Sequence, residues 1–125
     1  MFKTVIWLAI AGSLGTLARY SLSGIVQRVI ETSFPMGTVT VNITGCFIAG
    51  FLWTIFENRW AVSGETKIAV MIGFMGAFTT FSTLILESQE MFRSAQWVLG
   101  FSYLAIQNVT GLIAMLTGVF LGQLI

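Results

Sequence analysis

The chain has 125 residues, of which 56% are hydrophobic and 9% charged, with no histidine and a formal net charge of +1. This composition is typical of an integral membrane protein and excludes an ordinary soluble domain. It also argues against an enzyme, because the sequence offers no histidine, no metal-ligand cluster and no nucleophile beside a base, and against a nucleic-acid-binding protein, which needs a basic surface.

Charged residues leave four gaps in the chain, and each gap is about as long as the ~20 residues that cross a bilayer. The predicted spans lie near 3–23, 36–57, 67–91 and 96–123. We therefore expect an all-α integral membrane fold in which residues 1–125 form one four-helix transmembrane domain in the lipid bilayer.

In the first predicted span, Ala11, Gly15 and Arg19 follow one another at i, i+4 spacing, so a small-residue packing face leads to a cation. Arg19 either snorkels to the membrane interface or attracts anions at a vestibule. Lys3 and the apolar residues after it also fit a cleavable secretory signal. Cleavage would leave only three helices, so we expect this span to be retained.

The second predicted span carries small residues every four positions from Gly37 to Ala49, which predicts a helix-contact stripe. Asn42 stands beside that stripe at membrane depth, where an unpaired amide is costly. It must therefore pair with another helix or face a wet pathway.

The third predicted span contains the segment "GFMGAFTTFSTL" at residues 73–84. Gly73 and Gly76 each lower helix propensity by about 1 kcal/mol relative to alanine, and the hydroxyls of Thr79 and Thr80 offer other partners to the backbone. A helix break is predicted between residues 73 and 80. Such a break at membrane depth must be buried or line a cavity, where its carbonyls can coordinate a cation such as sodium.

Beyond the predicted break, Thr79, Thr83 and Glu87 are spaced to share one helix face, which Phe78 and Phe81 flank. Hydroxyl groups and the positive edges of phenyl rings can both contact a small anion that has shed its water. Such neutral groups bind an anion weakly enough for it to leave, whereas a buried lysine or arginine would hold it. The pattern favours a weak anion pathway.

The fourth predicted span is uncharged, and Tyr103, Gln107 and Thr110 form a polar stripe at spacings of four and three residues. The same stripe would serve to hold a helix bundle together through hydrogen bonds or to line a narrow aqueous track. Periodicity does not separate these two roles.

The basic residues divide equally between the two sides of the membrane that four spans imply. Lys3, Arg59 and Lys67 fall on one side, and Arg19, Arg28 and Arg93 on the other. The excess of basic residues that normally fixes orientation is therefore missing. Either the charges are too few for the rule to apply, or both orientations are made and form an antiparallel homodimer with twofold symmetry.

Three segments, "GSLGTLARY", "PMGTVTVNITGCFIAG" and above all "GFMGAFTTFST", resemble the small bacterial fluoride channels of the Fluc or CrcB family, and the similarity runs through all four spans. The resemblance implies a fluoride-selective channel that passively exports cytoplasmic fluoride across the bacterial inner membrane and relieves fluoride toxicity. It further implies a dual-topology antiparallel dimer with a structural sodium ion, which is not transported, at its centre.

The resemblance also implies roles for individual residues. The sodium ligands would be the backbone carbonyls of Gly76 and Thr79, contributed by both subunits. The fluoride pathway would be formed by residues of three spans, namely Asn42, Phe81, Ser82, Thr83, Glu87 and Tyr103.

Two departures from the family pattern bear on the pathway. Leu84 stands where the family usually has the second of two paired phenylalanines. Either the second ring is dispensable here, or Phe78 takes its place, or a homologous partner subunit supplies it. Gly111 and Met115 stand where many members carry hydroxyl residues, which leaves the track of the fourth span unassigned.

Two other functions fit parts of the pattern. A small multidrug-type exporter also uses four short helices and dual topology, but it needs a membrane-buried carboxylate to exchange protons, and Glu87 is the one candidate in the sequence. A structural subunit of a membrane complex would need only the glycine stripes and aromatic residues, and gives no reason for the Thr-Thr-Phe-Ser-Thr segment.

Overall fold

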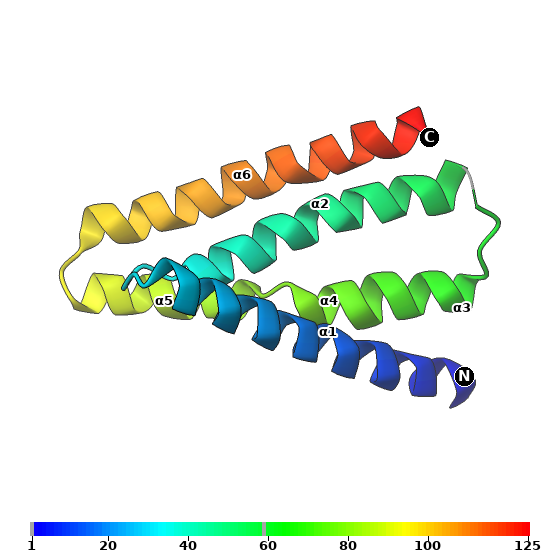
Figure 1. Ribbon diagram of the computed structural model, residues 1–125, viewed down its shortest axis with the longest axis horizontal. Coiled ribbons are helices and arrows are strands. Elements are labelled where there is room, and N and C mark those ends of the chain that lie inside the picture. The colour runs from blue at the N-terminus through cyan, green and yellow to red at the C-terminus, as the bar shows by residue number, and fades with distance from the viewer. Residues whose placement is uncertain (1, 59) are drawn as a thin grey trace.

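The computed structural model describes residues 2–58 and 60–125, and every regular element in this part of the chain is a helix. In chain order the elements are α1 (Phe2–Ile30), α2 (Met36–Asn58), α3 (Gly64–Lys67), the π-helix η1 (Ile68–Met75), α4 (Gly76–Phe78), α5 (Phe81–Arg93) and α6 (Trp97–Leu124) (Figure 1). Four helical segments are long and apolar enough to cross a membrane: α1, α2, residues 64–93 and α6. The predicted four-span, all-α fold is confirmed.

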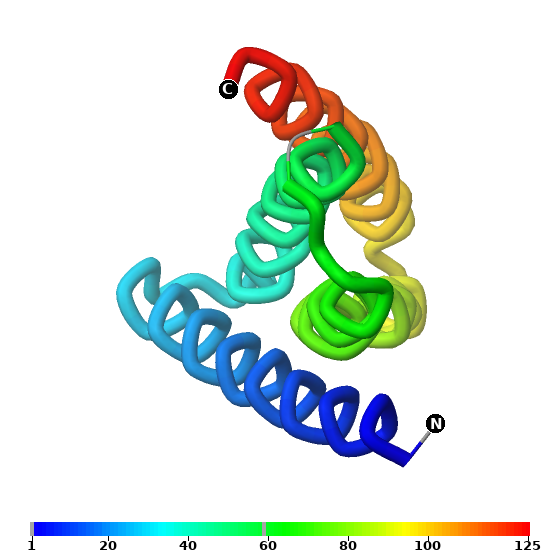
Figure 2. Tube along the Cα trace, turned by 90° about the vertical axis from the view of Figure 1, so that its right-hand side faces the viewer, coloured from blue at the N-terminus to red at the C-terminus, as the bar shows by residue number. Residues whose placement is uncertain are grey.

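The spans lie side by side in a bundle, and both ends of the chain lie at the same end of it as α3 (Figure 1). Viewed along the bundle, α1 and α6 occupy opposite sides, separated by α2 and the third span (Figure 2). Lys67 lies in the last turn of α3, whereas Arg28 and Arg93 lie in the last turns of α1 and α5. Arg59 lies outside the described residues.

The first span is longer than predicted, because α1 continues past residue 23 to Ile30. Residues 24–30 contain no proline, and the helix ends only where Glu31 adopts a left-handed φ of 47°. The Gln27 amide then holds the connection to α2, since its Nε2 donates to the Phe34 carbonyl and its Oε1 accepts from the Gly37 N–H. Both polar ends of this side chain are used.

Glycines bring the helix backbones together. A Cβ atom at Gly118 would collide with the Phe47 carbonyl where α6 meets α2, and one at Gly15 would collide with the Phe74 carbonyl where α1 meets η1. Gly45 is equally crowded by Thr79. The close packing predicted for the small-residue faces of the first two spans is confirmed, and it places α2 directly against the middle of the third span.

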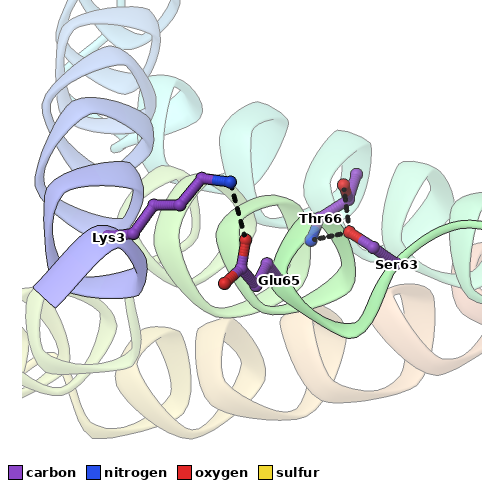
Figure 3. Close-up of polar contacts among 4 residues, drawn as sticks. All are labelled: Lys3, Ser63, Glu65 and Thr66. Carbon is purple, nitrogen blue, oxygen red and sulfur yellow. Dashed lines mark hydrogen bonds and ion pairs between the residues drawn. The ribbon is translucent and has the colours of Figure 1, made fainter. Parts of the chain in front are cut away.

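The third span begins at a capped helix end near the membrane surface. The Ser63 hydroxyl accepts the Thr66 N–H at 3.2 Å, and Lys3 of α1 approaches Glu65 at 3.6 Å (Figure 3). The ion pair is well exposed and therefore contributes ~1 kcal/mol or less. These contacts fix the start of α3 beside the start of α1.

The predicted break in the third span is confirmed, and it lies at Thr79 and Thr80 in the middle of that span. Thr79 has φ −83° and ψ 158°, and Thr80 has φ −147° and ψ 112°, so both are extended. Gly73 and Gly76 remain helical, contrary to the reasoning that placed the weakness at the glycines. Gly73 serves instead for close packing, because a Cβ there would press on Ala11 of α1.

Candidate functional site

The amide of Asn42, on α2, occupies the break in the third span. Its Oδ1 accepts the Thr80 N–H at 2.8 Å, and its Nδ2 donates to the Thr80 carbonyl at 3.1 Å. Because a bilayer offers no water to an interrupted backbone, the Thr80 N–H, which no longer has a carbonyl of the preceding turn, would otherwise be costly. Asn42 thus replaces the helical partner that the Thr80 N–H has lost, and of the two predicted alternatives for Asn42, pairing with another helix is observed.

Hydroxyl groups gather at the start of α5. The Thr80 Oγ1 accepts the Thr83 N–H at 3.2 Å and so caps the helix, and it donates to the Thr83 Oγ1 at 2.9 Å. The Ser82 Oγ lies 3.4 Å from the Thr80 Oγ1. Thr79 precedes α5, so the predicted shared face is formed by Thr83 and Glu87 without it.

A second polar cluster lies farther along α5. The carboxylate of Glu87 accepts from the Thr38 hydroxyl of α2 at 2.7 Å and from the Tyr103 hydroxyl of α6 at 2.6 Å. Tyr103 is fully buried, and its ring packs edge-on against Phe34 with centroids 5.2 Å apart. Each carboxylate oxygen therefore has a donor, and the carboxylate ties three spans together.

Two open cavities meet these clusters. One of about 450 Å³ runs from Arg19 and Tyr20 of α1 to Thr80 and Thr83 at the break. The other, about 530 Å³, is lined by Phe34, Glu87 and Glu90 among others. Ser23 and Thr38 line both cavities. A guanidinium and neutral hydroxyl groups thus line the same cavity.

Gln107 links α6 to the break. Its Oε1 accepts from the Asn42 Nδ2 at 2.8 Å, and the side chain is 5% exposed. Thr110, the next member of the predicted stripe, donates its hydroxyl to the Ile106 carbonyl of its own helix at 2.6 Å. Of the predicted stripe in the fourth span, Tyr103 and Gln107 therefore lie inside the bundle, whereas the Thr110 hydroxyl bonds to its own helix.

The predicted aromatic residues do not share one environment. Phe78, on α4, is buried and stacks on Phe74 with ring centroids 5.9 Å apart. Phe81, beyond the break, is 70% exposed on the outer surface of the chain, and Ser82 beside it is exposed as well. Leu84 is buried in a cluster with Met91 and Tyr103. Within one chain, the rings of Phe78 and Phe81 lie on opposite sides of the break.

The break frees two backbone carbonyls from their usual helical hydrogen bonds. In a continuous helix the Gly76 and Thr79 carbonyls would accept the N–H groups of Thr80 and Thr83, four residues on. These N–H groups donate to Asn42 Oδ1 and Thr80 Oγ1 instead. Among the described residues, no group of three or more histidine, cysteine or acidic side chains could hold a metal ion.

A family model described as "CrcB-like protein, Camphor Resistance (CrcB)" matches residues 6–119. The chain belongs to the CrcB family. This CrcB protein is 58% identical over 120 residues to the fluoride-specific ion channel FluC of Desulforapulum autotrophicum, a match that covers 96% of each chain. It is 44% identical to the FluC channel of Nitrosococcus oceani over the whole of both chains, and 42% identical to that of Nitratidesulfovibrio vulgaris strain Miyazaki F over 98% and 99% of the two chains. The predicted family is confirmed.

Sequence reasoning missed two residues of the CrcB protein's site. Thr38 precedes Asn42 by four residues, so the two share a face of α2, and this spacing was a usable signal for the contact with Glu87. Gln27 also lines the larger cavity, but it lies beyond the predicted end of the first span.

Proposed function

We propose that this CrcB protein is a fluoride-selective channel that passively exports cytoplasmic fluoride across the bacterial inner membrane and so relieves fluoride toxicity. The relatives that it matches over nearly their whole length are named fluoride-specific ion channels. The observation that carries the proposal is the cavity that is lined both by Arg19 and by the hydroxyls of Thr80 and Thr83 at the break. A channel of this kind transports an ion and carries out no enzymatic reaction.

The geometry suggests how an anion is attracted without being trapped. The charge of Arg19 raises the local anion concentration at the cavity mouth, where water still screens it. The same cavity is lined by Thr80 and Thr83, whose hydroxyl groups can replace part of the water shell once the Thr80 hydroxyl turns its proton away from Thr83. Because these donors are neutral, a small hard anion is bound weakly enough to continue.

The active form in this proposal is an antiparallel homodimer of dual topology. Phe81, Ser82 and Gly76 are exposed in the single chain although they lie in the middle of a membrane span. These residues flank the break, and carbonyls that the break leaves without helical partners are very unfavourable in lipid, so we expect protein to cover this face. A second copy related by a twofold axis would bring both breaks together, and the balanced basic residues permit both orientations.

A structural sodium ion at the centre of that dimer fits the same surface. The carbonyls of Gly76 and Thr79 from both subunits would supply hard oxygen ligands, and Gly76 is exposed without a side chain to obstruct the approach. When bound, the ion would offset the electrostatic repulsion between the carbonyl oxygens of the two subunits. The protein's own part is to hold the two carbonyls free of helical hydrogen bonds.

A growth experiment tests the function in cells. Expression in a bacterium that lacks its own fluoride exporter should restore growth on fluoride and leave resistance to cationic drugs unchanged. Resistance to cationic drugs without resistance to fluoride would instead indicate a small multidrug-type exporter. No change in either, with the protein present in the membrane, would leave a structural subunit, or a channel that requires a homologous partner subunit, and co-expression separates these.

A further inference from the structure

An apolar groove lies between the first half of α1 and the beginning of the third span. It has a volume of about 600 Å³, and its bulky lining side chains come from α1 and η1, namely Trp7, Ile10, Leu14, Val70 and Phe74. Ala11 and Ala69 also line the groove, and their methyl groups are too short to fill it. The groove shares no lining residue with the two cavities that meet the polar clusters. It is therefore a separate feature of the outer surface of the bundle.

The groove is polar at one end. Lys3, Ser63, Glu65 and Thr66 line this end, where Lys3 reaches from α1 across to Glu65 of α3 (Figure 3). From Lys3 to Leu14 the helix rises by about 16 Å. The hydrocarbon region of a bilayer is about 30 Å thick, so one leaflet accounts for about half of that. The groove thus has the length and the polarity of one phospholipid, with a place for a headgroup at the membrane surface and for an acyl chain below it.

The two charges at the polar end form a loose ion pair. The Lys3 Nζ lies 3.6 Å from the Glu65 Oε2, which is longer than a hydrogen bond, and the two side chains are 73% and 46% exposed. By contrast, the Lys67 Nζ lies 2.7 Å from the Glu57 Oε1. Lys3 and Glu65 both retain hydrogen-bonding capacity. The mouth of the groove therefore presents a cation and an anion side by side.

We propose that this groove binds an ethanolamine phospholipid, with one acyl chain between α1 and η1 and the headgroup at Lys3 and Glu65. The lipid phosphate accepts from the Lys3 ammonium, and the ethanolamine ammonium donates to the Glu65 carboxylate. A choline headgroup has no N–H donor for Glu65, and an anionic glycerol headgroup leaves Glu65 beside a like charge. The bound lipid joins α1 to α3 at the membrane surface, and its binding does not depend on fluoride conduction.

Lipid competition read by native mass spectrometry tests the proposal. The full-length protein, freed of lipid in detergent, is mixed with equal amounts of ethanolamine, choline and glycerol phospholipids that carry identical acyl chains. The ethanolamine lipid should be retained about threefold to fivefold over the choline lipid, as expected for one exposed ion pair. In Glu65→Gln this preference should disappear, and Lys3 alone should favour the anionic glycerol lipid. Glu57→Gln, which removes the carboxylate beside Lys67, is the matched control and should keep the preference.

Ala69→Phe tests the groove itself, because the added ring should fill it and reduce retention of the ethanolamine lipid. Glu65 is exposed, so Glu65→Gln keeps the test valid even where Ala69→Phe fails to fold. Equal retention of the three lipids by the wild type would overturn the proposal, and so would an ethanolamine preference that survives Glu65→Gln. A wild type that retains no lipid, together with weaker dimer cross-linking in Ala69→Phe, would show that a second copy of the chain fills the groove and that the proposal is wrong.

Discussion

Replacing Asn42 with leucine tests whether one amide supports the broken span. The substitution keeps the approximate shape of the side chain and removes three hydrogen bonds, two to the Thr80 backbone and one to Gln107. Polar contacts between membrane helices average ~0.6 kcal/mol each, which gives about 2 kcal/mol. The Thr80 N–H, left unpaired at ~1–3 kcal/mol, would raise the loss to about 4 kcal/mol.

The loss of unfolding free energy can be measured by denaturant titration of the purified protein in detergent, followed by tryptophan fluorescence or helical circular dichroism. Asn108→Leu is the matched control, because its amide is exposed and bonded only to its own helix. The control should lose less than about 1 kcal/mol. If Asn42→Leu is no less stable than Asn108→Leu, the amide does not hold the break and this account of it is wrong.

Three further substitutions and one ion replacement follow from the same contacts. Asn42→Asp keeps the acceptor for Thr80 but turns a carboxylate oxygen toward two other oxygens, so fluoride flux from liposomes should fall, and unchanged flux would remove Asn42 from the pathway. Leu84→Phe would be neutral or helpful by the family pattern, but Leu84 is 5% exposed, and overpacking should cost about 1–3 kcal/mol in the same denaturant titration. Gly118→Ala places a Cβ on the Phe47 carbonyl and should lower the melting temperature by several degrees, whereas Gly24→Ala, which meets nothing nearby, should not. Replacing sodium by a large organic cation should weaken the dimer, as read by cross-linking in detergent, and a dimer indifferent to sodium would remove the proposed ion.

Much of the architecture was predictable because membrane insertion imposes a simple rule on the sequence. Uncharged gaps located the four spans, and glycine repeats located the close contacts of Gly15 and Gly45. The end of α1 was misplaced because residues 24–30 are compatible with both helix and loop, and a left-handed Glu31 cannot be foreseen from its type.

The site was predictable in its members and not in its pairings. Spacing showed that Asn42 and Gln107 are buried polar residues, but which groups they meet depends on how far each helix is rotated about its axis. Phe78 is buried and Phe81 is exposed. Their spacing in the sequence cannot reveal this, because the break between them separates the orientations of α4 and α5. The break was predicted from the low helix propensity of the glycines. The extended residues are instead two threonines, and Asn42 and a helix cap supply hydrogen-bond partners at this point.

The most direct measurement is fluoride efflux from liposomes that contain only this purified chain, read with a fluoride electrode in the presence of sodium, beside vesicles loaded with chloride. The account predicts rapid fluoride efflux and retained chloride, which would also establish that the chain conducts without a different partner subunit and with Leu84 in place. Well-folded protein that releases no fluoride, or that releases chloride as fast as fluoride, would contradict it.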